Sequence, residues 1–254
     1  MYEMGKKKSI KNASLEQRAK VFCQVFNTLL LSSTVNRMGM IVLGYVKDAD
    51  EIQEFSAAER CESDSEHMIS FVWAAWLWDV LFRKELPDFK CGKVKYIGSL
   101  HDVAEALIGG DIPDDGNDRN LTKDERELKA FKLLVQQLPK KERKKATKAF
   151  KKFQAKDGYA YVIDKMLFPL VQLWRIKNGW PEGDMKLKEK FGIMTGSDAE
   201  FMEATGSTEP IVVTTAHALT VTKGKPGFAV ASAIIKAQFA EAGKEIPESL
   251  LSYF

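Results

Sequence analysis

Apolar residues recur at three- and four-residue spacing along most of this chain, and this pattern predicts α-helices. Ser14 can cap a first helix, whose apolar stripe covers 21–30 and whose Arg18 is predicted to face solvent. A second helix over 66–82 is apolar nearly all round, which is typical of a helix at the centre of a bundle. The N-terminal third is therefore predicted to supply a helical core.

The same spacing predicts four more helices, over 96–110, 123–138, 140–156 and 157–179. The helix over 140–156 is the most basic stretch of the chain, but its single arginine and two phenylalanines do not make the regular basic and aromatic interleaving of a nucleic-acid site. Those lysines are therefore predicted to be its solvated face rather than a nucleic-acid site.

The chain changes character near residue 180, where glycine and polar residues become frequent. Residues 209–228 alternate β-branched and other side chains around a Gly-Lys-Pro-Gly turn, which predicts a strand or a small β-hairpin. A small-residue helix follows and ends at Gly243. The predicted organisation is one helical domain over 1–180 and a C-terminal extension over 181–254 that packs on it.

Composition and charge indicate an ordinary globular protein. Of 254 residues, 45% are hydrophobic, and the formal net charge of +3 is too small to argue for nucleic acid or a membrane surface. No apolar run reaches the roughly 18 residues that a membrane helix needs, and the basic residues near the start have no apolar core behind them, so no secretory signal is expected. Three widely spaced cysteines fit reduced thiols, so a cytoplasmic location is expected, with no membrane or nucleic-acid polymer as partner.

The stretch with the clearest chemistry is Leu100-His101-Asp102-Val103-Ala104-Glu105-Ala106-Leu107, followed by Asp111-Ile112-Pro113. On a helix, the side chains at 101, 102 and 105 would converge on one side. Taken alone, this motif favours a buried structural histidine beside two solvated acids. However, the chain has only three histidines, and His67 and Asp164 also stand in strongly apolar helices. Charges in such places are costly unless they are paired or bind a metal.

Four motifs of the chain, taken in order, resemble those of the HD-domain metal-dependent phosphohydrolases. They are Ser65-Glu66-His67, LHDVAEALIGGDIP, ERELKAFKLLVQQLP and YVIDKMLFPLVQL. The similarity is greatest to the branch of the bacterial 5'-deoxynucleotidase and the eukaryotic HD domain-containing protein 2, and it covers about residues 20–177. It implies an all-α HD-domain helical bundle.

The resemblance also implies a ligand set and roles for other residues. One divalent metal would be bound by the two histidines and two aspartates of the pattern, which are His67, His101, Asp102 and Asp164. Two imidazoles and two carboxylates suit manganese, iron, cobalt or zinc better than magnesium or calcium. Glu105 would be the catalytic carboxylate that orients water or moves a proton, with Asp111 assisting it. Arg37 would hold the substrate phosphate.

Three departures from the family pattern affect what the resemblance implies. Gly109-Gly110 adds one residue before Asp111, and Met38 stands where the bacterial enzyme has a tryptophan that contacts the sugar. The segment between Arg37 and His67 is also longer than in either relative. Selectivity for deoxyribose therefore does not carry over to this chain.

The predicted function is hydrolysis of a nucleotide phosphate ester, foremost a (deoxy)ribonucleoside 5'-monophosphate, to nucleoside and phosphate. One alternative is an HD-type (deoxy)nucleoside triphosphate hydrolase, for which Met38 and the longer segment leave room. A second is a nucleotide-sensing HD domain without turnover. The expected partners are a small-molecule nucleotide and a second copy of the chain in a homodimer, while His217 is expected to be structural or exposed.

Overall fold

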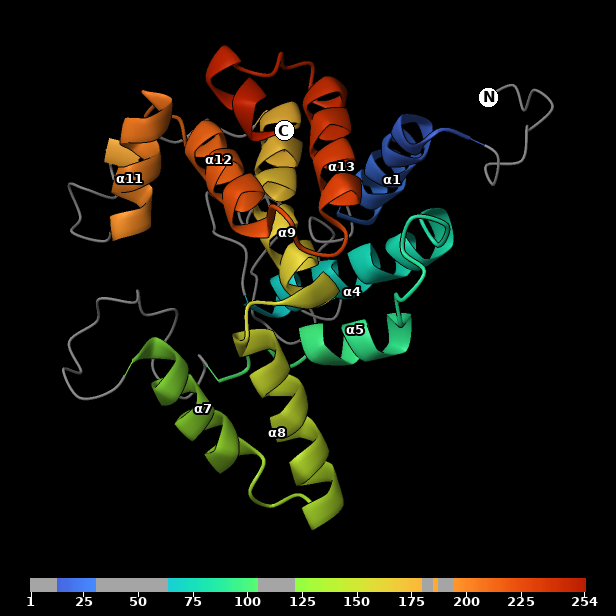
Figure 1. Cartoon of the computed structure of the whole chain (residues 1–254), viewed down its shortest axis with the longest axis vertical. Coiled ribbons are helices and arrows are strands. Elements are labelled where there is room, and N and C mark those ends of the chain that lie inside the picture. The colour runs from blue at the N-terminus through green and yellow to red at the C-terminus, as the bar shows by residue number, and fades with distance from the viewer. Residues whose placement is uncertain (1–12, 31–63, 105–121, 180–184, 187–193) are drawn as a thin grey trace, which may run out of the picture.

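The computed structural model describes residues 13–30, 64–104, 122–179, 185–186 and 194–254, and within these ranges every long element is a helix (Figure 1). The main elements are α1 (Leu15–Leu30), α4 (Asp64–Leu81), α5 (Cys91–Gly98), α7 (Lys123–Leu134), α8 (Lys140–Gln154), α9 (Gly158–Lys177), α11 (Gly196–Thr205), α12 (Pro210–Thr222), α13 (Phe228–Glu241) and the short 3-10 helix η3 (Glu248–Tyr253). The all-α prediction is confirmed.

Helix α9 is the central element of the fold (Figure 1). Helices α12 and α13 pack along it, and α1 packs against both α13 and α4. Helices α4 and α5 contact the N-terminal part of the bundle around α9, and the α7–α8 pair projects from this end. This arrangement brings the start of α4, the end of α5 and the first turns of α9 to one place.

Helix α1 begins where the sequence predicts. The Ser14 backbone N–H donates to Gln17 Oε1 at 3.0 Å, and the Gln17 N–H donates back to Ser14 Oγ at 3.3 Å. This reciprocal pair satisfies two N–H groups that a helix start otherwise leaves without a partner.

One residue of α1 departs from the prediction of a solvated side chain. The Arg18 guanidinium is buried, donates to the Leu81 carbonyl oxygen at 2.9 Å, and forms an ion pair with Glu85. Burial is tolerated here because the guanidinium has both a carboxylate and a carbonyl as acceptors.

The core is densest where α1, α4, α9 and α13 meet. Helix α4 contributes Phe71 and Trp78, which are fully buried. Between α1 and α13, Gln238 donates to Asn27 Oδ1 at 2.9 Å and accepts from Asn27 Nδ2 at 3.3 Å. Gln238 also donates to the Leu170 carbonyl oxygen of α9 at 3.4 Å, so one buried amide joins three helices.

The prediction of a strand or hairpin over 209–228 is wrong, because α12 occupies most of it. Pro210 stands in the first turn, where its missing N–H costs nothing. Thr214 and Thr222 donate their hydroxyls to carbonyl oxygens one turn earlier, each at 2.6 Å. The helix is buried against α9, α11 and η3, so packing outweighs the strand preference of its β-branched residues. The division into domains over 1–180 and 181–254 remains a prediction.

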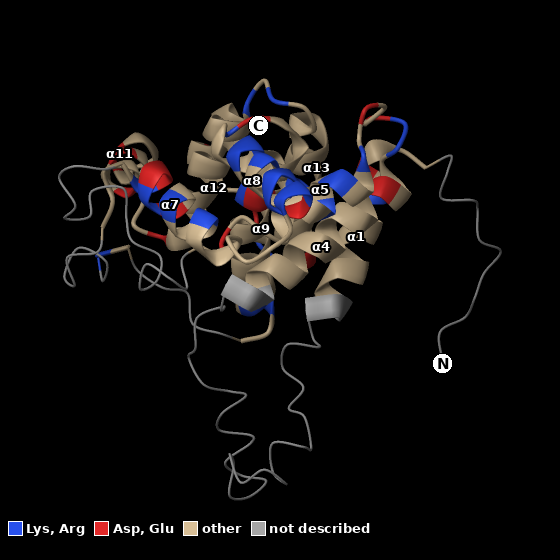
Figure 2. Ribbon diagram, turned by 90° about the horizontal axis from the view of Figure 1, so that it is seen from below, with Lys and Arg blue, Asp and Glu red and all other residues tan. Residues whose placement is uncertain are grey.

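The basic helix α8 has the solvated face that its sequence predicts (Figure 2). Its lysines are exposed, while Ala146 and Phe150 on the opposite side are buried. Among the residues described here, no helix is long and apolar enough to cross a membrane.

Candidate metal centre

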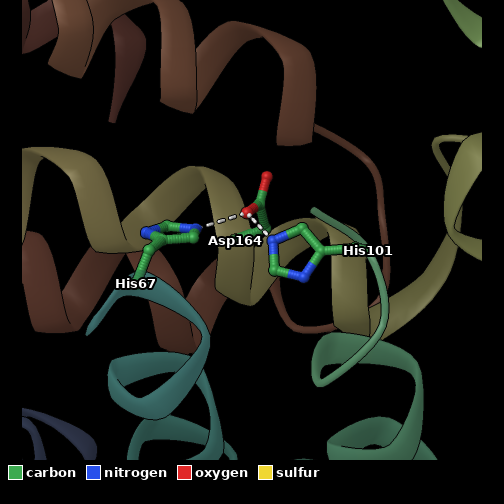
Figure 3. Close-up of side chains that lie close together, drawn as sticks. All are labelled: His67, His101 and Asp164. Carbon is green, nitrogen blue, oxygen red and sulfur yellow. Dashed lines mark hydrogen bonds and ion pairs between the residues drawn. The ribbon is translucent and has the colours of Figure 1, made fainter. Parts of the chain in front are cut away.

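Two histidines and a buried carboxylate converge where α4, the end of α5 and the first turns of α9 meet (Figure 3). His67 is in the first turn of α4, His101 follows the end of α5, and Asp164 is in the second turn of α9. Asp164 Oδ1 is 2.9 Å from His67 Nε2 and 3.1 Å from His101 Nε2. One ligand atom from each of the three residues lies within 4.8 Å of the other two.

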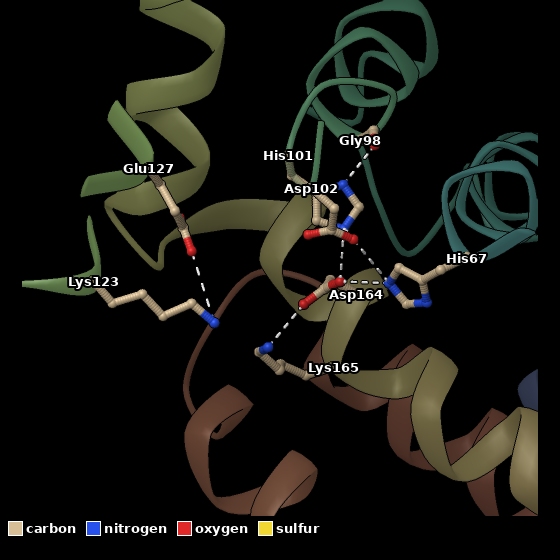
Figure 4. A network of polar contacts seen from close by, with 8 residues as sticks. All are labelled: His67, Gly98, His101, Asp102, Lys123, Glu127, Asp164 and Lys165. Atoms are coloured by element: carbon tan, nitrogen blue, oxygen red, sulfur yellow. Dashed lines mark hydrogen bonds and ion pairs between the residues drawn. The ribbon is translucent and has the colours of Figure 1, made fainter. Parts of the chain in front are cut away.

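Asp102 lies beside this cluster (Figure 4). Its Oδ2 atom is 2.9 Å from His101 Nε2 and 3.9 Å from His67 Nε2. The structure thus brings together all four residues that the sequence nominates as metal ligands, with His67, His101 and Asp164 as the tightest group.

The helix predicted over 96–110 is wrong for residues 99–104, which form turns at the candidate site, while 105–110 lie outside the described residues. Helix α5 stops at Gly98, and His101 and Asp102 lie in the turn that follows. A Cβ atom at position 98 would lie only 2.0 Å from the Phe71 ring, so this approach of α5 to α4 requires glycine. The turn redirects His101 toward α9, which a continuous helix would not do.

The imidazole of His101 is held from several sides. Its side chain is only 1% exposed, and aromatic rings surround it, with centroids 4.5 Å away for Phe153 and 5.5 Å for Phe71. The ring of His67 is 5.4 Å away. On the remaining side Nδ1 faces the Gly98 carbonyl oxygen.

The contact with Gly98 fixes which nitrogen of His101 bears hydrogen. A carbonyl oxygen only accepts, so Nδ1 must donate to it. In neutral imidazole, Nε2 is then the unprotonated nitrogen, and its lone pair faces oxygens of Asp102 and Asp164. A lone pair facing two carboxylates is unfavourable unless a cation lies between them. This arrangement of a backbone-anchored imidazole is typical of histidine ligands to metals.

The charges around His101 favour a positive charge at this position. Burial lowers the pKa of His101, but its contacts with Asp102 and Asp164 raise it by more, to about 9. For Asp164, burial raises the pKa, but Lys165, His101 and His67 lower it by more. The pKa of Asp164 therefore lies well below the usual range. The site therefore has strong negative character that a proton or a metal ion would neutralise.

The donor set and its spacing fit a divalent transition metal. Ligand atoms bound about 2.0–2.2 Å from one ion are separated by roughly 3–3.5 Å, and the two His–Asp164 distances are 2.9 and 3.1 Å. Imidazole nitrogens with carboxylate oxygens suit zinc, manganese, iron or cobalt. His67, His101 and Asp164, with Asp102 beside them, are thus suited to hold such an ion.

Sequence reasoning missed Lys165. Its Nζ is 2.9 Å from Asp164 Oδ2, the oxygen that does not face the histidines (Figure 4). Adjacent residues on a helix do not normally face each other, so the sequence offers little signal for this contact. Glu127 of α7 is a second omission; it is buried, pairs with Lys123 at 3.7 Å, and has a pKa raised by burial.

Three residues with predicted roles in the site lie outside the described residues, so these roles remain predictions. They are Arg37, Glu105 and Asp111. His217 lies away from the metal candidates, on α12, where its ring stacks on Phe201 with centroids 5.2 Å apart.

Fold and site together define a helical domain with a candidate His-Asp metal centre. A sequence model of the HD domain family matches residues 51–205, which is more than half of the chain and includes His67, His101, Asp102 and Asp164. The chain belongs to the HD domain family, whose members are generally metal-dependent hydrolases. No curated protein and no solved structure matches the chain.

Proposed function

We propose that this protein hydrolyses a nucleotide phosphate ester, foremost a (deoxy)ribonucleoside 5'-monophosphate, to nucleoside and phosphate. The observation that carries the proposal is the convergence of His67 and His101 Nε2 on Asp164 Oδ1 in a member of the HD domain family. The choice of a nucleotide rests on the sequence motifs that resemble the 5'-deoxynucleotidase branch.

The four residues of the candidate metal centre differ in exposure, which gives the site a buried side and a more open side. His101 and Asp164 are almost completely buried, whereas His67 and Asp102 are partly exposed. Substrate would therefore approach from the side of His67 and Asp102. A divalent ion held by these residues supplies a Lewis acid and a water of lowered pKa.

Net charge also supports an anionic substrate. When both histidines are neutral, as metal ligands are, Asp102 and Asp164 contribute two negative charges and Lys165 one positive charge, so these groups sum to −1. With a divalent cation the sum becomes +1, which attracts a phosphate monoester. Lys165 limits the excess negative charge and occupies Asp164 Oδ2, leaving Oδ1 directed at the histidines.

The test is a substrate screen with defined metals. Protein stripped with a chelator would be reloaded separately with manganese, cobalt, iron, zinc or magnesium and incubated with nucleoside 5'-mono- and triphosphates. We expect inorganic phosphate and nucleoside from monophosphates with a transition metal. Release of triphosphate or pyrophosphate would identify a triphosphate hydrolase instead, and binding of both metal and nucleotide without turnover would identify a nucleotide sensor.

His101→Asn and His217→Asn make a matched pair of variants. The first alters the candidate centre and the second alters a histidine that stacks on Phe201 elsewhere in the fold. We expect His101→Asn to lose more activity than the about 10–100-fold typical of residues that only support ligands. Equal activity in the two variants would overturn the proposal.

A further inference from the structure

Helix α4 has an exposed apolar stripe on the side opposite its core face. Ile69, Trp76 and Val80 are 50%, 45% and 56% exposed, and Trp73 between them is partly buried. The sequence predicts burial all round this helix, so the stripe is a departure from that prediction. In Figure 2, α4 lies beside α1 and is drawn mostly in tan, so charged residues are few along α4.

The spacing of the stripe matches a helix-pairing seam. The intervals between Ile69, Trp73, Trp76 and Val80 are four, three and four residues, so two apolar positions recur in each seven. This narrow pattern is typical of a helix that packs against one other helix. At one edge of the stripe, Asp79 pairs with Arg83 at 2.7 Å, which gives the seam a charged rim.

The stripe is also symmetric about its own centre. A two-fold axis through the point between Ala74 and Ala75 would place Ile69 opposite Val80 and Trp73 opposite Trp76 of a second helix running the other way. Each bulky side chain then meets a bulky one, and each aliphatic side chain meets another. Such self-complementarity is what a two-fold interface between identical chains requires.

We propose that the α4 stripe is the contact between two copies of this chain in an antiparallel homodimer. The antiparallel orientation sets the two helix dipoles in opposite directions, whereas a parallel pair would place like ends together. Aromatic residues, tryptophan above all, are also the side chains most enriched at the energetic centre of protein interfaces. The proposal does not depend on the proposed enzymatic function.

The dimer leaves the candidate metal centre accessible. His67 lies two residues before Ile69, which places it about 200° away around the helix axis, on the core side of α4. The size of the stripe also sets the expected affinity. Four partly exposed side chains bury less than the roughly 800 Å² per partner of a standard interface, so we expect dissociation in the micromolar range.

Sedimentation velocity or light scattering over about 1–100 µM tests the proposal. We expect a monomer–dimer equilibrium for the full chain, and monomer for both Trp76→Glu and Val80→Glu. Leu251→Glu is the matched control, because Leu251 is 59% exposed on η3, and it should dimerise like the unmodified chain. Circular dichroism of each variant confirms that the helices remain folded.

Orientation is tested by disulfide cross-linking. A mixture of Ile69→Cys and Val80→Cys chains should yield a cross-linked dimer that neither variant forms alone, because only the antiparallel pair places 69 opposite 80. A monomer at every concentration would overturn the proposal, as would a dimer that persists in both charged variants. Cross-linking of Ile69→Cys with itself alone would overturn the antiparallel arrangement.

Discussion

Asp164 and Lys165 are neighbours on α9, and the lysine Nζ lies 2.9 Å from Asp164 Oδ2 while Oδ1 faces the two histidines. Each oxygen of one buried carboxylate therefore has its own partner. The lysine keeps the carboxylate from rotating, so it positions a candidate ligand without facing the metal position itself.

Lys165→Met is expected to weaken metal binding by about 10–100-fold, the usual effect of losing a group that orients a ligand. Competition with a chromophoric chelator measures this affinity without relying on turnover. Lys165→Arg should restore part of it, because the guanidinium can still donate to Oδ2. Lys177→Met, which removes an exposed pair with Glu241, is the control and should leave the affinity unchanged. Unchanged affinity in Lys165→Met would show that Asp164 needs no such support.

Gly98→Ala is expected to destabilise the fold, because the new methyl group would overlap the fully buried Phe71 ring. Overpacking of this kind costs about 1–3 kcal/mol in free energy of unfolding, measured with urea. Gly92→Ala is the matched control on the same helix, since nothing lies within 4 Å of a Cβ there. That change should be neutral or slightly stabilising. Equal stabilities would mean that Phe71 can move aside.

The Arg18–Glu85 pair should make stability fall in acid. The hydrogen bonds from Arg18 lower the pKa of Glu85 below its ordinary value of 4.5. A lowered folded-state pKa stabilises the fold above the ordinary value, and this stabilisation is lost as the pH falls through the folded-state pKa. Glu85→Gln should therefore cost about 1.5–3 kcal/mol at pH 7. Urea titrations at a series of pH values should show this difference from the unmodified chain shrinking below about pH 4.5. A constant difference would refute the assignment.

Glu105→Gln tests the catalytic role that the resemblance implies. A group that orients water or transfers a proton contributes about 10²–10⁴-fold to the rate, so kcat should fall by that amount. Metal affinity should not change, because Glu105 is not among the predicted ligands. Glu200→Gln, an exposed change on α11, should leave both quantities as they are. Loss of metal together with activity would place Glu105 in the ligand set instead.

Local spacing predicts most of the helices, because periodicity depends on neighbouring residues. The four ligand candidates instead follow from the resemblance to the HD-domain family. Local spacing does not predict the close approach of Gly98 to the Phe71 ring, because Phe71 lies 27 positions earlier in the chain. Local spacing places Arg18 on a solvated face, because spacing carries no information on its partner Glu85, which is 67 positions away. Helix α12 looked like a strand because its surroundings bury it on several sides and so remove the amphipathic period.

The buried amide pair of Asn27 and Gln238 has a consequence for how the chain can be divided. The family match covers 51–205, which includes every ligand candidate, whereas α1, α12 and α13 lie outside it. Yet α12 and α13 cover α9, and Gln238 joins α13 to both α1 and α9. Cutting the chain to 51–205 would leave apolar side chains of α9 in water. The segment that carries the family signature is therefore smaller than the unit that folds.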